Sequence, residues 1–240
     1  MLCTNRRSPG FACIVAGILA LVFSIPAVSG VQCAQQEKTA AFIKSLTGEW
    51  IGTCRQITDG DQTEDKYFYA KFEKTGDNIF SGKFTYYRLD IKTGEPLNIG
   101  ETTIASTIQE DGTVKNDIAG KGTMLVSNQP KDQEHQLIEI LTVADNGSIV
   151  GKLDGKINVS GMPFGLGKNG KIRNATSAWK LEDGVMTIDQ SLKAAFKVLM
   201  ATKSFTVEAH SVARRGTDVI SLMKKDQLAE KVAARPASGS

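Results

Sequence analysis

Few side chains in this chain could carry acid–base or metal chemistry. The 240 residues contain only two histidines, His135 and His210, and neither a His-x-x-x-His nor a Cys-x-x-Cys pair. Metal sites need such pairs to bring several ligands to one point. His135 lies in the polar run KDQEHQ, which predicts a solvated loop residue. No G-x-S-x-G elbow for a nucleophilic serine is present either. The sequence therefore favours a non-enzymatic protein, whereas an isomerase or cyclase would need acids or a histidine converging inside the fold.

Three glycines, Gly165, Gly167 and Gly170, match the G-x-G-x-x-G spacing of a dinucleotide-binding turn. That turn requires a helix after it, because the helix N-terminus meets the pyrophosphate. Here residues 171–181 alternate in hydropathy as a strand does. The glycines therefore indicate the tip of a hairpin over residues 161–170, as a plain loop or as a lid over a cavity.

Residues 1–29 have the pattern of a signal peptide. Arg6 and Arg7 precede the apolar run FACIVAGILALVF, and small residues follow it up to Ser29. We expect cleavage between Ser29 and Gly30 and a protein that is exported, either periplasmic or secreted. The alternative is an uncleaved anchor, although the run is shorter than the roughly 20 residues of a spanning helix.

The charge of the mature chain is almost balanced. The full chain has 29 basic and 26 acidic residues, and two of the basic residues belong to the signal peptide, which leaves a net charge of +1. A balanced surface excludes nucleic acid as the expected partner. No later apolar run is long enough for a transmembrane segment.

Two cysteines, Cys33 and Cys54, remain after the signal peptide is removed. In an oxidising compartment this count predicts one disulfide between the N-terminal tail and the first strand. Closing a loop of this length contributes about 3 kcal/mol of stability. The alternatives are two free thiols, or a Cys54 simply buried in the wall of the fold.

From Gly48 onward the hydropathy alternates with a period of two, which is typical of half-buried strands. Asn-Gly and Asp-Gly pairs separate the runs, as in type I′ hairpins, and indicate a meander of antiparallel strands. The sequence predicts an all-β fold, an antiparallel up-and-down β-barrel, with a short N-terminal helix over residues 35–46. Strand-like runs include residues 66–75, 78–89, 136–143, 149–159, 172–181, 205–214 and 219–223.

The expected organisation follows from these patterns. A signal peptide occupies residues 1–29, and an N-terminal tail with the short helix occupies residues 30–47. The β-barrel domain covers residues 48–225. Residues 226–240 end in ARPASGS and are expected to form a disordered tail.

Residues 48–54 read G-x-W-x-G-x-C, with Trp50 at the start of the first strand. This motif resembles the calycin superfamily of lipocalin-like barrels, and it is most similar to the nitrobindin-like barrels. Met200, Ala201 and Thr202, followed by His210 and Arg214, are similar to the last two strands of nitrobindins. The resemblance implies a haem-binding role for His210 as the iron ligand. Cys54 departs from the family pattern, which has glycine there.

Alternation along residues 205–214 leaves the direction of His210 open. One face of this strand carries Phe205, Val207, Ala209 and Ala213, and the other carries Thr206, Glu208, His210 and Arg214. If the apolar face lines the lumen, His210 points to solvent. If the mixed face lines it, His210 lies inside with Glu208 as a neighbour that could orient it.

Two functions fit these features of the sequence. The first is an exported, non-enzymatic barrel that binds a small hydrophobic or haem-like ligand in its lumen. Its candidate lining residues are Trp50, Phe80, Phe84, Tyr86 and Trp179. The second is an envelope protein with a structural or interaction role, whose barrel is filled by its own side chains and holds no ligand.

Overall fold

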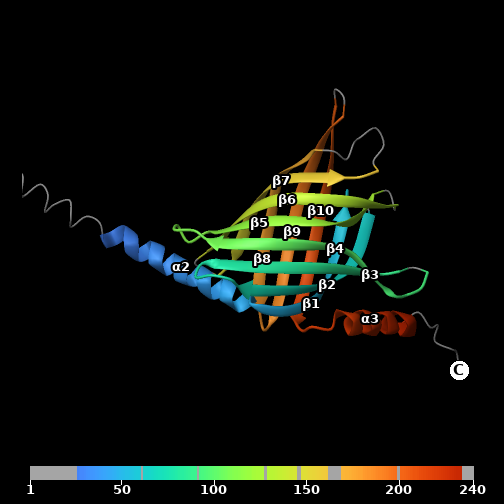
Figure 1. Cartoon of the computed structure of the whole chain (residues 1–240), viewed down its shortest axis with the longest axis horizontal. Coiled ribbons are helices and arrows are strands. Elements are labelled where there is room, and N and C mark those ends of the chain that lie inside the picture. The colour runs from blue at the N-terminus through green and yellow to red at the C-terminus, as the bar shows by residue number, and fades with distance from the viewer. Residues whose placement is uncertain are drawn as a thin grey trace, which may run out of the picture.

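The computed structural model of the chain describes residues 26–60, 62–90, 92–126, 129–144, 147–161, 169–198 and 201–233. Ten antiparallel strands form a closed barrel (Figure 1). Each strand pairs with its neighbours in the sequence, and β1 closes the barrel against β10. The predicted antiparallel up-and-down barrel is confirmed. The strands are β1 (Gly48–Thr58), β2 (Gln62–Lys74), β3 (Ile79–Leu89), β4 (Pro96–Ile108), β5 (Val114–Val126), β6 (Gln129–Val143), β7 (Ile149–Val159), β8 (Gly170–Glu182), β9 (Val185–Val198) and β10 (Ala201–Arg215).

Tight hairpins join these strands where the sequence has Asp-Gly pairs. Asp183 and Gly184, between β8 and β9, have φ angles of 50° and 73°, and the flanking residues Glu182 and Val185 are paired. Two consecutive positive φ angles in a two-residue loop are typical of a type I′ turn, whose twist matches that of the flanking strands. Asp59 and Gly60, between β1 and β2, also have positive φ angles, of 52° and 81°, but in a longer loop, because Thr58 pairs with Gln62. These corners therefore set the meander that the sequence predicts.

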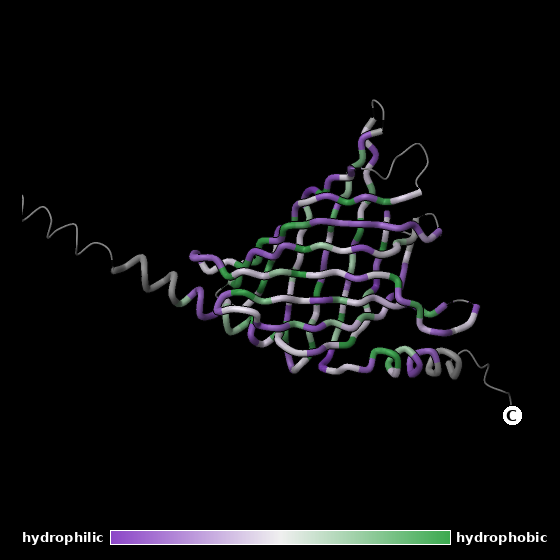
Figure 2. Tube along the Cα trace, in the orientation of Figure 1, coloured by the Kyte–Doolittle hydropathy of each residue, from purple (hydrophilic) through white to green (hydrophobic). Residues whose placement is uncertain are grey.

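Hydropathy changes from residue to residue along the strands, as the colours of the tube in Figure 2 show, and successive side chains of a strand point to opposite faces of the sheet. In β7, Ile149 and Leu153 are buried, while Val150 and Lys152 are exposed. Inward-facing glycines leave space for larger neighbours. A Cβ atom on Gly151 would lie 2.2 Å from Ser177 Oγ, and one on Gly120 would lie 2.5 Å from the His135 ring.

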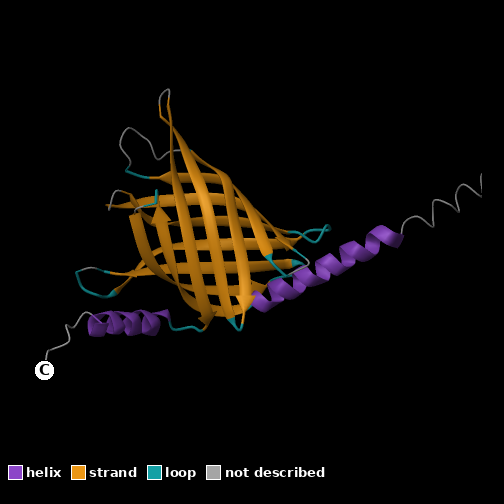
Figure 3. Ribbon diagram, turned by 180° about the vertical axis from the view of Figure 1, so that it is seen from behind, coloured by secondary structure: helices purple, strands orange, loops and turns teal. Residues whose placement is uncertain are grey.

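One end of the barrel is closed by its own side chains and by α2 (Pro26–Leu46). Ile43 and Leu46 of this helix belong to the same core cluster as Trp50. Thr39 Oγ1 donates a hydrogen bond of 2.6 Å to the carbonyl of Gly112 in the β4–β5 turn, and Gln36 Nε2 donates to the carbonyl of Glu110 at 2.8 Å. We call this the closed end, and the opposite end of the barrel the far end. Both helices lie outside the barrel wall (Figure 3).

The helix α2 is longer than the sequence predicts, because it starts at Pro26 rather than at residue 35. Residues 26–29 of the predicted signal peptide form its beginning, and residues 1–25 lie outside the described residues. The described residues also do not include Gly165 and Gly167 of the glycine-rich motif, or Met200. The predicted cleavage point and domain boundaries stay predictions.

The strand predicted over residues 219–223 is wrong, because α3 (Val219–Ala233) occupies this part of the chain. Asp218 caps the helix: its carboxylate accepts hydrogen bonds from the backbone N–H and the hydroxyl of Ser221 at 2.9 and 2.6 Å. The helix also continues past residue 226, where we expected a disordered tail, and residues 234–240 lie outside the described residues. Val219 and Met223 are buried.

Candidate functional site

A cavity of about 190 Å³ lies inside the barrel, between its middle and the far end. Its apolar lining includes Phe68, Phe84, Ile104, Ile118, Trp179 and Ile188, and its polar lining includes Gln56, Lys66, Thr102, Gln133, His135, Gln190 and Ser211. The closed half of the barrel is filled instead, with only about 20 Å³ of free space beneath Ile43 and Leu46. The lumen is thus half solid and half hollow.

Aromatic rings form one wall of the cavity. The centroid of Phe84 lies 5.6 Å from that of Phe68 and 6.1 Å from that of Tyr86, whose ring is stacked on it. These are favourable separations for aromatic pairs. The Tyr86 hydroxyl is hydrogen-bonded to Thr102, and burial raises the pKa of Tyr86 well above its ordinary value. This wall offers a flat apolar surface with a neutral phenol at its edge.

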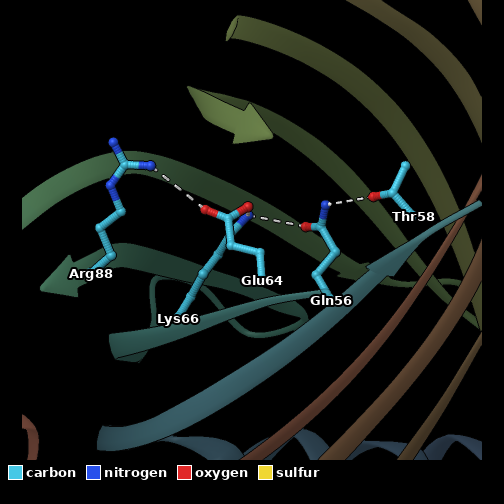
Figure 4. A network of polar contacts seen from close by, with 5 residues as sticks. All are labelled: Gln56, Thr58, Glu64, Lys66 and Arg88. Atoms are coloured by element: carbon cyan, nitrogen blue, oxygen red, sulfur yellow. Dashed lines mark hydrogen bonds and ion pairs between the residues drawn. The ribbon is translucent and has the colours of Figure 1, made fainter. Parts of the chain in front are cut away.

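A charged network lies beside this wall on the inner face of β1, β2 and β3 (Figure 4). Lys66 Nζ lies 3.0 Å from Glu64 Oε2 and donates a 3.0 Å hydrogen bond to Gln56 Oε1. Gln56 in turn donates to Thr58 at 3.5 Å, and Arg88 Nη1 lies 3.9 Å from Glu64 Oε1. Glu64 and Lys66 are 7% and 6% exposed. A buried ion pair of this kind is often no more stable than apolar residues of the same size.

The Glu64 carboxylate is poorly satisfied in spite of this ion pair. Neither of its oxygens has an aligned hydrogen-bond donor among the described residues. A buried carboxylate oxygen without a donor costs free energy. The charge of Glu64 is therefore balanced by Lys66 and, at a longer distance, by Arg88 rather than by aligned hydrogen bonds.

His135 faces the lumen from β6, so its interpretation as a loop residue was wrong. Its register partner Gly120 leaves space for the imidazole ring. Burial lowers the pKa of His135, which keeps the imidazole neutral at neutral pH. Among the described residues no hydrogen bond joins His135 to an acid.

A second acid, Glu139, is fully buried in β6, toward the closed end. It accepts hydrogen bonds from Asn116 Nδ2 at 2.7 Å, from Trp179 Nε1 at 3.3 Å and from the Ser177 hydroxyl. Three donors satisfy the carboxylate without a cation. Because Trp179 also lines the cavity, Glu139 fixes the orientation of a ring in its wall.

The predicted disulfide between Cys33 and Cys54 is not formed. Cys54 is a free, buried thiol that lines the cavity. Cys33 lies thirteen residues before the end of α2, about 20 Å along the helix axis at 1.5 Å per residue. A disulfide requires Cα atoms within about 7 Å. Of the alternatives, a Cys54 buried in the barrel wall is the one observed, and burial raises the pKa of its thiol.

We expect Cys54 to react slowly in the folded protein. In protein produced as residues 30–240 with Cys33→Ser, the only thiol is Cys54, and its raised pKa and burial lower the amount of thiolate that iodoacetamide can reach. Alkylation should be on the order of 100-fold slower than in urea-unfolded protein. The unaltered protein of residues 30–240, denatured without reductant, should show two free thiols, and a mass lower by two hydrogens would contradict this expectation.

His210 points away from the lumen. Its Nδ1 lies 2.5 Å from Asp189 Oδ1 on the outer face, and its side chain is 56% exposed. The apolar face of β10 lines the cavity instead, through Val207 and Ala209. His210 therefore cannot ligate a haem iron in the lumen, which corrects the role implied by the family resemblance.

The five candidate aromatic residues divide between the two halves of the barrel. Phe84, Tyr86 and Trp179 line the cavity. Trp50 and Phe80 are buried in the closed half, where Trp50 Nε1 donates a 2.7 Å hydrogen bond to the carbonyl of Leu46. The prediction of an aromatic lining missed the polar residues of the site. Strand alternation places Glu64 and Lys66 on the same face as Phe68, and this pattern could have revealed both residues as part of the lining.

The described part of the chain brings no three His, Cys, Asp or Glu side chains together as a metal site requires. Neither described helix combines the length and apolarity needed to cross a membrane.

The fold and the site define a closed, ten-stranded up-and-down barrel with a hollow, partly polar lumen. No family model matches the chain, and no curated protein matches it. One similar solved structure is Rv2717c from M. tuberculosis, with a TM-score of 0.47 and 12% identity over 75% of this chain and 98% of that chain. Another is the S-type phycobiliprotein lyase CPES from Guillardia theta, with a TM-score of 0.46 and 10% identity over 80% of this chain and 99% of that chain. TM-scores and identities this low support no inference about function. Membership of the nitrobindins stays a prediction.

Proposed function

We propose that this chain is an exported, non-enzymatic barrel that binds a small, largely apolar molecule with one polar end in its lumen. The observation that carries the proposal is the hollow far half of a barrel whose closed half is densely filled. Apolar walls with a few polar groups that fix orientation are the usual design of a small-molecule site. The aromatic wall would hold the apolar body of the ligand, and the network around Lys66 would hold its polar end.

The volume of the cavity limits the size of the ligand. An engineered apolar cavity of about 150 Å³ holds one benzene molecule, whereas pockets for drug-sized ligands measure about 300–1,000 Å³. The 190 Å³ found here therefore match a body of one or two rings, or a short chain. A haem would require the barrel to widen, and His210 lies on the wrong face to hold its iron.

Two alternatives make different use of the same barrel. An envelope protein without a ligand would need no cavity, and only the closed half fits that description. An enzyme is favoured by His135, Lys66 and Glu64, which all face the interior. No acid orients His135 among the described residues, and we therefore place binding first.

Titration with the fluorescent two-ring probe 1-naphthylamine tests the proposal. We expect saturable binding with a stoichiometry of one, and native mass spectrometry of the freshly purified protein should detect a retained small molecule. Absence of saturable binding by this and other one- or two-ring probes would contradict the proposed function. Conversion of a retained molecule during incubation would favour the enzyme.

Export is part of the proposal, and the contacts of α2 support it. The hydrogen bonds that join α2 to the barrel turns start at Gln35, well after Ser29. Cleavage between Ser29 and Gly30 would leave these contacts in place. Intact mass of the protein from a secreting host should correspond to residues 30–240, and retention of residues 1–29 would contradict this part of the proposal.

A further inference from the structure

We propose that Glu64 determines the ligand class of the cavity, by rejecting anionic ligands and selecting uncharged ligands whose polar end accepts a hydrogen bond, such as an amide or a hydroxyl. This inference rests on the proposed function, because it concerns the polar end of the molecule bound in the lumen. It assigns a role to a buried carboxylate that acts through its ion pair with Lys66.

The charge at the polar end of the cavity is already compensated. Lys66, which lines the cavity, has Glu64 as its counter-ion at 3.0 Å. The neutral imidazole of His135 adds no charge. Arg88 is 3.9 Å from Glu64, partly exposed and therefore screened by solvent, and the Lys121 side chain is also exposed. A ligand that approaches Lys66 thus meets an ion pair rather than a lone cation.

The geometry of this ion pair opposes a second anion. A ligand oxygen that accepts a hydrogen bond from Lys66 Nζ lies about 3 Å from it, and Glu64 Oε2 lies 3.0 Å from the same atom. The two negative groups are then at most about 6 Å apart in a site with little water. Their repulsion cancels much of the attraction that Lys66 exerts, and like charges brought together in this way are a common source of discrimination.

The same atoms favour a neutral polar group. Lys66 has three N–H donors, of which Gln56 takes one, while Glu64 lies 3.0 Å from Nζ without an aligned hydrogen bond. A further N–H can therefore reach a ligand acceptor in the cavity that Lys66 lines. An uncharged amide or hydroxyl supplies this acceptor without a second negative charge, whereas a carboxylate brings that charge with it.

Binding of 2-naphthamide and 2-naphthoate, measured by calorimetry at pH 7.5, tests this inference. The two probes share one ring system and differ in the charge of the polar end. The unaltered protein should bind the amide at least about tenfold more tightly than the carboxylate. In Glu64→Gln the affinity for 2-naphthoate should rise roughly tenfold or more, because Lys66 then lacks a counter-ion, and the affinity for 2-naphthamide should change by less than about threefold.

Asp65→Asn is the matched control. Asp65 is the next residue on β2, carries the same charge and pairs with Arg55 on the outer face, so its removal should leave both affinities unchanged. A double variant, Glu64→Gln with Lys66→Gln, removes both charges without leaving a buried lysine alone. The double variant should not show the increased affinity for 2-naphthoate that we expect of Glu64→Gln. It also keeps the test available if Glu64→Gln alone folds poorly.

The outcomes separate this inference from the proposed function. If the amide binds but the unaltered protein shows no preference, or if Glu64→Gln does not raise the affinity for 2-naphthoate, Glu64 does not set the ligand class, while a binding barrel remains. If neither probe binds any variant and 1-naphthylamine does not bind either, the proposed function fails, and this inference fails with it.

Discussion

Replacing Ala209 by phenylalanine is expected to reduce ligand affinity on the order of 100-fold. Ala209 lines the cavity from β10, and a phenyl ring is about the body that a 150 Å³ cavity holds, so it would fill most of the 190 Å³ available. The free energy of unfolding should change by less than about 1 kcal/mol, because the ring enters empty space rather than a packed core. Titration with 1-naphthylamine and thermal unfolding measure the two effects.

Ala119→Phe provides the control for this substitution. Ala119 is exposed on the outer face of β5, so the same ring added there cannot reach the lumen. Its affinity should equal that of the unaltered protein. Binding that survives in Ala209→Phe would place the ligand outside the cavity and would remove the main support for the proposed function.

Trp50→Ala should cost about 3–5 kcal/mol of stability, which is the usual range for deleting a buried tryptophan. The Trp50 side chain is 0% exposed, donates a hydrogen bond to the Leu46 carbonyl and lies 4.0 Å beneath the guanidinium carbon of Arg215. The substitution therefore loosens α2, β1 and the end of β10 together. For a domain of this size the melting temperature should fall by about 6–20 °C.

Trp50→Phe keeps an aromatic ring in the closed end but removes the indole N–H and part of the indole volume. Its loss of stability should be clearly smaller than that of Trp50→Ala. A Trp50→Ala variant that unfolds within about 2 °C of the unaltered protein would show that the closed end is not the part of the core on which the barrel depends.

Hydropathy alternation and Asp-Gly corners made the barrel predictable from sequence, because strands and type I′ turns are set by neighbouring residues. The short run 219–223 was misassigned because a few apolar residues fit a strand or a helix equally well, and the Asp218 cap that decides the matter was overlooked. His135 was missed because polar residues on both faces hide the alternation in the first half of β6.

The candidate site was harder to predict, since it depends on distances across the barrel. The number of cysteines predicts a disulfide between Cys33 and Cys54, yet Cys33 lies on α2 and Cys54 faces the lumen. The proximity of Asn116, Ser177 and Trp179 to Glu139 results from the register of β5, β6, β7 and β8, which no local pattern reveals. Whether the lumen is hollow depends on the combined volume of all inward side chains, and the alternation along single strands does not give this volume.

The pairing of β1 with β10 has a consequence for how the polypeptide acquires its shape during synthesis. Trp50 pairs with Arg215, so the first and last strands must meet across almost the whole chain, and contacts of such long range slow folding. A nascent chain that emerges N-terminus first has nine hairpin-linked strands before β10 arrives, with the edges of β1 and β9 both unpaired. Such edges are prone to aggregate, and the newborn protein therefore depends on rapid completion of its last strand or on a chaperone that covers these edges.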